Sequence, residues 1–200
     1  MKIDEKSLAH FNQLKSLVMD FNNVYGLNCS ILIGYKNKVN FKSSKDIHIF
    51  INKTDLINFS LEENSWSLNN NLNFILLHQK ESKLVQKIGV LFFILLGILF
   101  SFVFDTLTLS NQIICFFSLL SFFSILKYWF SRYLIYKADN LSTNDKNIRE
   151  ALSFLYSKNL EDQNIFLWYN FITNRILTFI SPFPSYLDRA EKLRKLYNLN

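Results

Sequence analysis

Two long uncharged runs constrain the fold of this chain more than any other feature of its sequence. The first extends from Ile88 to Phe104, about 17 residues, and the second from Thr106 to Leu126, about 21 residues. Runs of this length and composition predict helices that span a membrane. The alternative is a pair of buried core helices, but the polar remainder of the chain is too small to cover two of them. We therefore predict a transmembrane helical hairpin over residues 85–127.

Positive charges flank the predicted hairpin on both sides. Lys80, Lys83 and Lys87 precede it, and Lys127 and Arg132 follow it, whereas the connecting loop carries no positive charge. The positive-inside rule then places both termini in the cytoplasm of an integral membrane protein, in the inner membrane if the cell is bacterial. The net charge of +6 favours a bilayer with anionic headgroups as partner. No Arg-rich stretch interleaved with aromatic residues predicts a nucleic-acid partner.

The hairpin divides the polar chain into an N-terminal half, 1–84, and a helical C-terminal half, 128–200. Apolar residues at helical spacing predict a helix over 4–22, and strict alternation predicts strands over 29–35 and 46–51. A loop then leads into a helix that we expect to begin near Ser67. The sequence therefore predicts an α+β protein, mostly helical, with a small antiparallel sheet.

The segment His78-Gln79-Lys80-Glu81-Ser82, just before the first apolar run, contains part of a metal-site pattern. The zinc motif H-E-x-x-H places two histidine ligands and a glutamate base on one helix face. Here Gln79 occupies the position of the base and Ser82 that of the second histidine. Glutamine cannot accept a proton from a metal-bound water, and a serine hydroxyl is a poor zinc ligand. On residue chemistry alone, His78 is a single histidine on a helix, either hydrogen-bonded or exposed.

The order of segments around His78 resembles a known family. "FILLHQKES" is followed by two apolar helices, then by "SRYLIYKAD" at 131–139 and "SPFPSYLDRAEKL" at 181–193. This order is similar to that of the HtpX-like membrane zinc endopeptidases, in the gluzincin group that also holds the CAAX prenyl proteases. The resemblance covers about residues 5–197 and implies a zincin-like metallopeptidase domain with the hairpin inserted in it.

Carried over residue by residue, the resemblance implies a site that has lost its chemistry. His78 matches the first zinc ligand, but Gln79 replaces the base, Ser82 the second histidine ligand and Ile135 the glutamate ligand. Phe183 replaces a further histidine of the family. The family positions that are kept are structural: Arg132, Ala138, Asp139, Pro184 and Arg189.

These replacements imply a catalytically inactive peptidase homologue without a cofactor. Its expected role is to bind a peptide or protein partner, for example an active membrane protease. In the active family an edge strand beside the metal helix holds an extended peptide, and the strand over 46–51 or a neighbour could keep that role. Two alternatives stay open. One is an active zinc metalloendopeptidase in which Glu81, His10 or His48 joins His78, and the other is an unrelated two-helix membrane protein.

Overall fold

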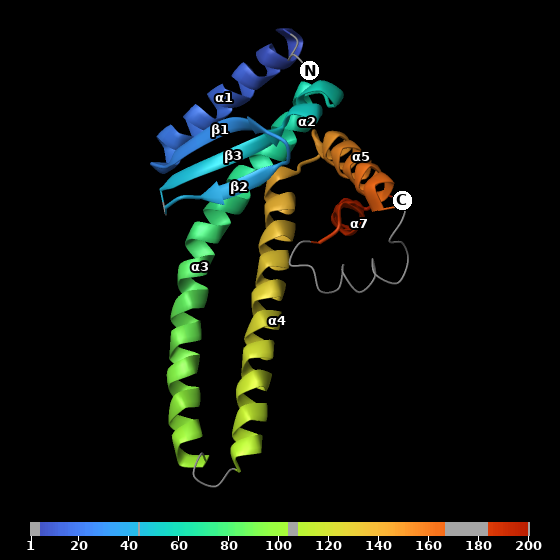
Figure 1. Ribbon diagram of the computed structural model, residues 1–200. Coiled ribbons are helices and arrows are strands. Elements are labelled where there is room, and N and C mark those ends of the chain that lie inside the picture. Colours follow the sequence, from blue (N-terminus) through green and yellow to red (C-terminus); the bar gives the residue numbers. More distant parts are fainter. Residues whose placement is uncertain (1–4, 44, 104–107, 167–183, 200) are drawn as a thin grey trace.

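The computed structural model describes residues 5–43, 45–103, 108–166 and 184–199, with some side chains between 84 and 127 and those of 162–166 left out of the description (Figure 1). The elements are α1 (Glu5–Tyr25), β1 (Asn28–Gly34), β2 (Lys38–Phe41), β3 (Asp46–Asn52), α2 (Lys53–Asn58), α3 (Leu61–Val103), α4 (Leu109–Ser142), α5 (Ile148–Phe166) and α7 (Tyr186–Leu196).

The three strands form one mixed sheet in the order β1-β3-β2. β1 runs parallel to β3, with Cys29 opposite Ile47, and β2 runs antiparallel to β3, with Phe41 opposite Ile47. The predicted antiparallel sheet is therefore wrong. Alternation of apolar and polar residues is the same in a parallel and an antiparallel strand with one covered face, so the pattern did not distinguish them.

One face of the sheet is covered by α1 and α3. The odd-numbered residues of β1 and β3 point to this face because side chains alternate along a strand. They form a core with apolar residues of both helices: Leu14, Val18, Cys29, Ile31, Ile47, Ile49, Ile51, Leu68, Leu72 and Ile75. Ile47, Ile49 and Ile51 are thus buried on one face, which is what the alternation over 46–51 predicts.

The helix α3 begins at Leu61, six residues before the predicted start at Ser67. Ser60 and Glu63 form a capping box: the Glu63 backbone N–H donates to Ser60 Oγ over 3.2 Å, and the Ser60 N–H donates to Glu63 Oε2 over 2.8 Å. This reciprocal pair satisfies backbone donors that a helix start leaves free. The polar stretch "SLEENSWS" is therefore helical.

The helices α3 and α4 form a long antiparallel pair that extends well beyond the sheet (Figure 1). Over the part of the chain that the structure describes, neither is long and apolar enough to cross a membrane. The predicted transmembrane hairpin is therefore wrong. The uncharged part of α3 begins only after Lys87 and its described part ends at Val103, and the apolar part of α4 contains the polar residues Ser118 and Ser121. The predicted lipid partner and the cytoplasmic placement of both termini depended on that hairpin and stay predictions.

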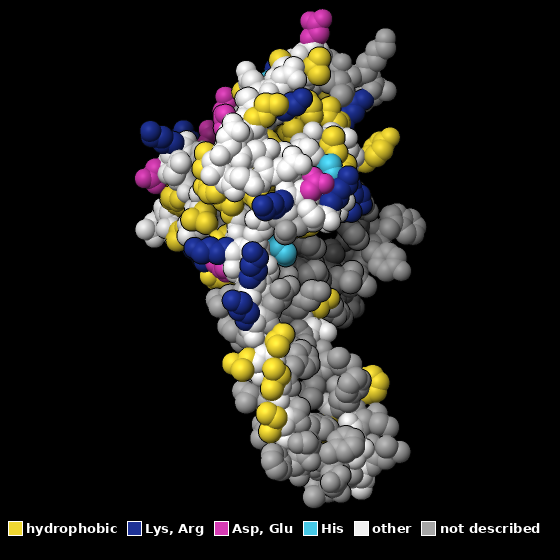
Figure 2. Space-filling view, turned by 90° about the vertical axis from the view of Figure 1, so that its left-hand side faces the viewer, with side chains coloured by type: hydrophobic (Ala, Val, Ile, Leu, Met, Phe, Trp, Pro, Cys, Tyr) yellow, Lys and Arg dark blue, Asp and Glu magenta, His cyan; other side chains and the backbone are white. Residues whose placement is uncertain are grey.

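The part of this pair that lies beyond the sheet exposes large apolar side chains. Val90 and Leu91 of α3 are each 60% exposed, and Phe117 and Trp129 of α4 are also exposed. Figure 2 shows hydrophobic side chains gathered on this lower part, below a group of Lys and Arg side chains.

A second core joins the C-terminal helices to the start of α3. Trp66 of α3 packs against Phe154 of α5, with ring centroids 5.8 Å apart. Ala190 and Leu193 of α7 belong to the same cluster, together with Ala151 and Leu155 of α5. This core holds α7 beside α4, which sets the position of the groups described next.

Candidate functional site

The two helices that carry the predicted site lie side by side. The Lys137 ammonium of α4 donates to Glu81 Oε1 of α3 over 2.5 Å, and Asn70 Nδ2 of α3 donates to Asp139 Oδ1 over 2.7 Å. The segment with His78, Gln79 and Ser82 thus faces the α4 segment with buried Ile135. Phe183 lies outside the described residues.

His78 is packed as an aromatic ring. Its imidazole stacks on Phe41 at the end of β2, with centroids 4.8 Å apart and planes 29° apart, and it also contacts Phe74 one turn earlier in α3. Burial lowers the pKa of His78 because the charged imidazolium would lose hydration there. A neutral ring between two phenyl rings fills space, and this differs from both the exposed and the hydrogen-bonded histidine considered above.

The substitute metal ligands do not gather around His78. Among the described residues no three His, Cys, Asp or Glu side chains lie close enough together to hold a metal ion. Glu81 is paired with Lys137, and His48 Nδ1 lies 2.5 Å from Ser30 Oγ on the other face of the sheet. His10 belongs to α1.

The family positions Asp139 and Arg189 form a buried ion pair. Arg189 donates from Nε to Asp139 Oδ2 over 2.9 Å and from Nη2 to Oδ1 over 2.6 Å. Burial alone would lower the pKa of Arg189, but the carboxylate of Asp139 raises it above its usual value. Two parallel charge-assisted bonds of this kind fix orientation as well as distance.

Sequence reasoning missed Asn70, which completes this ion pair from α3. Asn70 donates to Asp139, and its Oδ1 accepts from Arg189 over 3.3 Å. One signal was available, since Asn70 is four residues after Trp66 and seven before Leu77, so it shares their buried face of α3. One turn further along α4, Thr143 accepts from Trp66 Nε1, and its carbonyl accepts from Tyr197. The family positions thus link three helices.

The other family positions are also structural. Ala138 is fully buried and packs with Leu77 and Leu134 between α3 and α4. Pro184 is buried, and Arg132 lies 3.7 Å from Asp188 at the partly exposed start of α7. None of them points to bound substrate or metal.

The two edges of the sheet differ. At β1 the Asn22 side chain of α1 binds the backbone of Cys29 twice, accepting from its N–H and donating to its carbonyl, both over 2.8 Å. This side-chain amide takes the place of a neighbouring strand. No described strand or helix pairs with the outer edge of β2.

The backbone of β2 presents its free groups to that open edge. Lys42 N–H donates to the Asp46 carbonyl over 3.0 Å. In an antiparallel ladder the bonded positions alternate, so the backbone groups of Asn40 face β3. Those of Val39 and Phe41 face away from it, next to the ring of His78.

Comparison with known proteins identifies no relative. No family model matches the chain, and neither a curated protein nor a solved structure is significantly similar to it.

Proposed function

We propose that this protein is a catalytically inactive relative of the HtpX-like peptidases that binds extended peptide segments at the open edge of β2. The observation that carries the proposal is the open edge of β2, where the backbone groups of Val39 and Phe41 have no partner among the described residues. At β1, by contrast, Asn22 occupies the outward backbone groups of Cys29. An unpaired edge is a template for an added strand, which main-chain hydrogen bonds hold.

The surroundings of β2 favour binding over hydrolysis. Hydrolysis by a zincin requires a metal-bound water and a base that accepts its proton. Beside β2 stands His78, stacked on Phe41, with Gln79 where the base would be. A stacked aromatic pair next to an open strand offers apolar contact to side chains of a bound segment.

The test uses fluorescently labelled, enzymatically dephosphorylated casein, an unfolded chain, as the peptide probe. We expect saturable binding without cleavage. Val39→Pro removes the backbone N–H that faces the open edge, and Pro is tolerated in edge strands. We expect it to weaken binding about tenfold, as for one lost hydrogen bond whose acceptor is left unpaired. Val39→Ala keeps the N–H and is the matched control, with an affinity close to that of the native protein.

The outcomes separate the proposal from its alternatives. Equal affinities of Val39→Pro and Val39→Ala, with both variants folded by circular dichroism, would contradict binding at the β2 edge. Cleavage of casein and stoichiometric zinc by elemental analysis, both lost in His78→Ala, would instead establish the active metallopeptidase with atypical ligands.

A further inference from the structure

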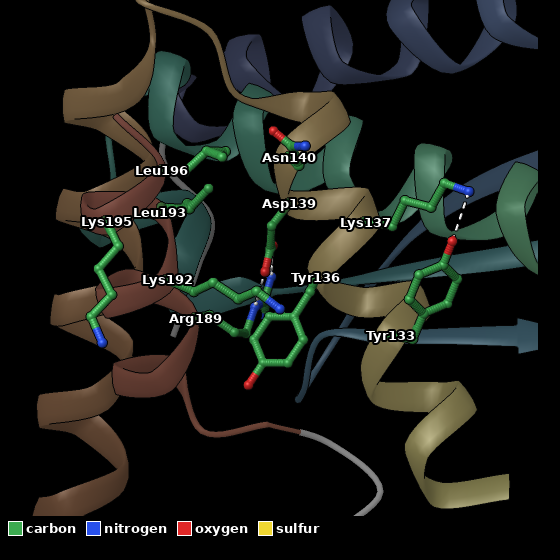
Figure 3. Close-up of a pocket in the computed structure, with 10 residues that line it drawn as sticks. All are labelled: Tyr133, Tyr136, Lys137, Asp139, Asn140, Arg189, Lys192, Leu193, Lys195 and Leu196. Atoms are coloured by element: carbon green, nitrogen blue, oxygen red, sulfur yellow. Dashed lines mark hydrogen bonds and ion pairs between the residues drawn. The ribbon is translucent and has the colours of Figure 1, made fainter. Parts of the chain in front are cut away.

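A pocket of about 580 Å³ lies between α4 and α7, on the side of α4 away from the sheet (Figure 3). This volume is within the range of small-molecule sites. Its wall from α4 includes Tyr133, Tyr136 and Lys137, and its wall from α7 includes Arg189, Lys192 and Lys195. The pocket thus gathers four cationic side chains, and the one acidic side chain among its lining residues is Asp139.

Two of these four cations already have partners. Arg189 is paired with Asp139 at the base of the pocket, and Lys137 is paired with Glu81. Lys192 and Lys195 have no acidic partner within the part of the chain that the structure describes. Lys195 extends away from α4, whereas Lys192 reaches towards it (Figure 3). The pocket therefore keeps the positive charge of Lys192, which no described carboxylate neutralises.

The remaining polar groups of the pocket can donate hydrogen bonds. Tyr133 Oη accepts from Lys137 Nζ over 3.0 Å, which leaves its own hydrogen for another acceptor. Lys192 Nζ lies 3.7 Å from the centroid of the Tyr136 ring, close enough for a cation–π contact that holds the ammonium over the pocket. Figure 3 shows the Lys192 side chain extending from α7 towards Tyr136.

We propose that this pocket binds the phosphate group of a small phosphomonoester, which the Lys192 ammonium and the Tyr136 hydroxyl contact (Figure 3). Planar carboxylates are best matched by a free guanidinium fork, but the guanidinium of Arg189 is occupied by Asp139. Ammonium groups act as point charges and suit a phosphate, whose oxygens accept from several directions. The volume leaves room for the organic part of the ligand.

A phosphomonoester of this kind is found free in solution or as a lipid headgroup, so the test has two arms. The soluble probe is glycerol phosphate, followed by calorimetry with glycerol as blank. The lipid probe is a phosphatidylcholine vesicle containing phosphatidic acid, with pure phosphatidylcholine as blank. We expect saturable binding in at least one arm. Binding of glycerol phosphate assigns a soluble ligand, and binding of the vesicles alone assigns a headgroup.

Matched variants locate the binding. Lys192→Gln keeps the length of the side chain and removes its charge, and we expect affinity to fall about tenfold. Tyr136→Phe keeps the ring under Lys192 and removes one donor, so it weakens binding less. Lys146→Gln removes an exposed charge outside the pocket and leaves affinity unchanged. The proposal is overturned if neither probe binds saturably, or if Lys192→Gln and Lys146→Gln lose affinity equally. Neither result bears on the β2 edge, because casein binding is measured without phosphate.

Discussion

At the scale of single residues, His78 makes stability depend on pH in a predictable direction. Its pKa in the folded protein lies below the ordinary value of 6.5. The unfolded chain therefore binds more protons than the folded one as pH falls through 6.5, and stability is lost on the acid side. The stabilisation is complete above that value.

Replacing His78 by Phe should flatten this dependence, because the ring stack with Phe41 and Phe74 is kept and the titrating group is removed. Between pH 7 and pH 5 the free energy of unfolding should fall less steeply in His78→Phe than in the native protein. The difference in slope should be at most about 1.4 kcal/mol per pH unit, the limit for one proton. Urea unfolding at a series of pH values measures it, and parallel profiles would contradict the packing described for His78.

At the scale of elements, one side chain of α1 occupies the start of the outer edge of β1. Asn22→Ala removes both hydrogen bonds to the Cys29 backbone, which we expect to cost about 1–3 kcal/mol because two buried backbone groups lose their partner. The variant also frees the outer edge of β1 at Cys29, so it should aggregate faster, as followed by light scattering. Asn23→Ala, at an exposed neighbouring position of α1, is the control and should match the native protein in both measurements.

Most helices and strands could be predicted from the sequence, because the spacing of apolar residues shows which face of each element is buried. The helix over 4–22 corresponds to α1, and the strands over 29–35 and 46–51 correspond to β1 and β3. The direction of β1 relative to β3 could not be predicted, since alternation does not depend on strand direction. The start of α3 at Leu61 could have been predicted, because Ser60 and Glu63 have the spacing of a capping box.

The candidate site was predictable only in part. Gln79 and Ser82 predict the loss of the usual zinc chemistry, and this stays a prediction. Stacking of His78 on Phe41 joins residues whose contact depends on the sheet order, which the sequence does not show. The pocket of Lys192 and Lys195 depends on how α7 packs against α4. No local pattern in a charged helix distinguishes such a surface from ordinary solvated lysines.

At the scale of the whole molecule, a buried ion pair joins residues 103 positions apart. Lys158 of α5 donates to Asp55 of α2, and both side chains are almost fully buried. Asn37 donates to the other oxygen of Asp55 over 2.6 Å. This pair connects the sheet region to the C-terminal helices, so breaking it should destabilise both regions.

Lys158→Met leaves the Asp55 carboxylate buried without its cation, which we expect to cost about 3–5 kcal/mol. In the double variant Asp55→Asn with Lys158→Met no buried unpaired charge remains, because Glu161, the second partner of Lys158, is 40% exposed, and the amide can still accept from Asn37. The double variant should therefore lose less free energy of unfolding than Lys158→Met alone. Thermal unfolding followed by circular dichroism measures both. If the double variant is less stable than Lys158→Met, the buried unpaired charge of Asp55 is not the cause of the destabilisation.

The amide of Asn22 also bears on how assemblies of this protein can grow. A sheet with two free margins can recruit copies at both ends and grow without a fixed size. Here a side chain of the same molecule occupies the margin of β1 at Cys29, so two copies that join through β2 present an obstructed position where a third copy would add. Growth of the sheet beyond a dimer is therefore hindered at this position by a single residue.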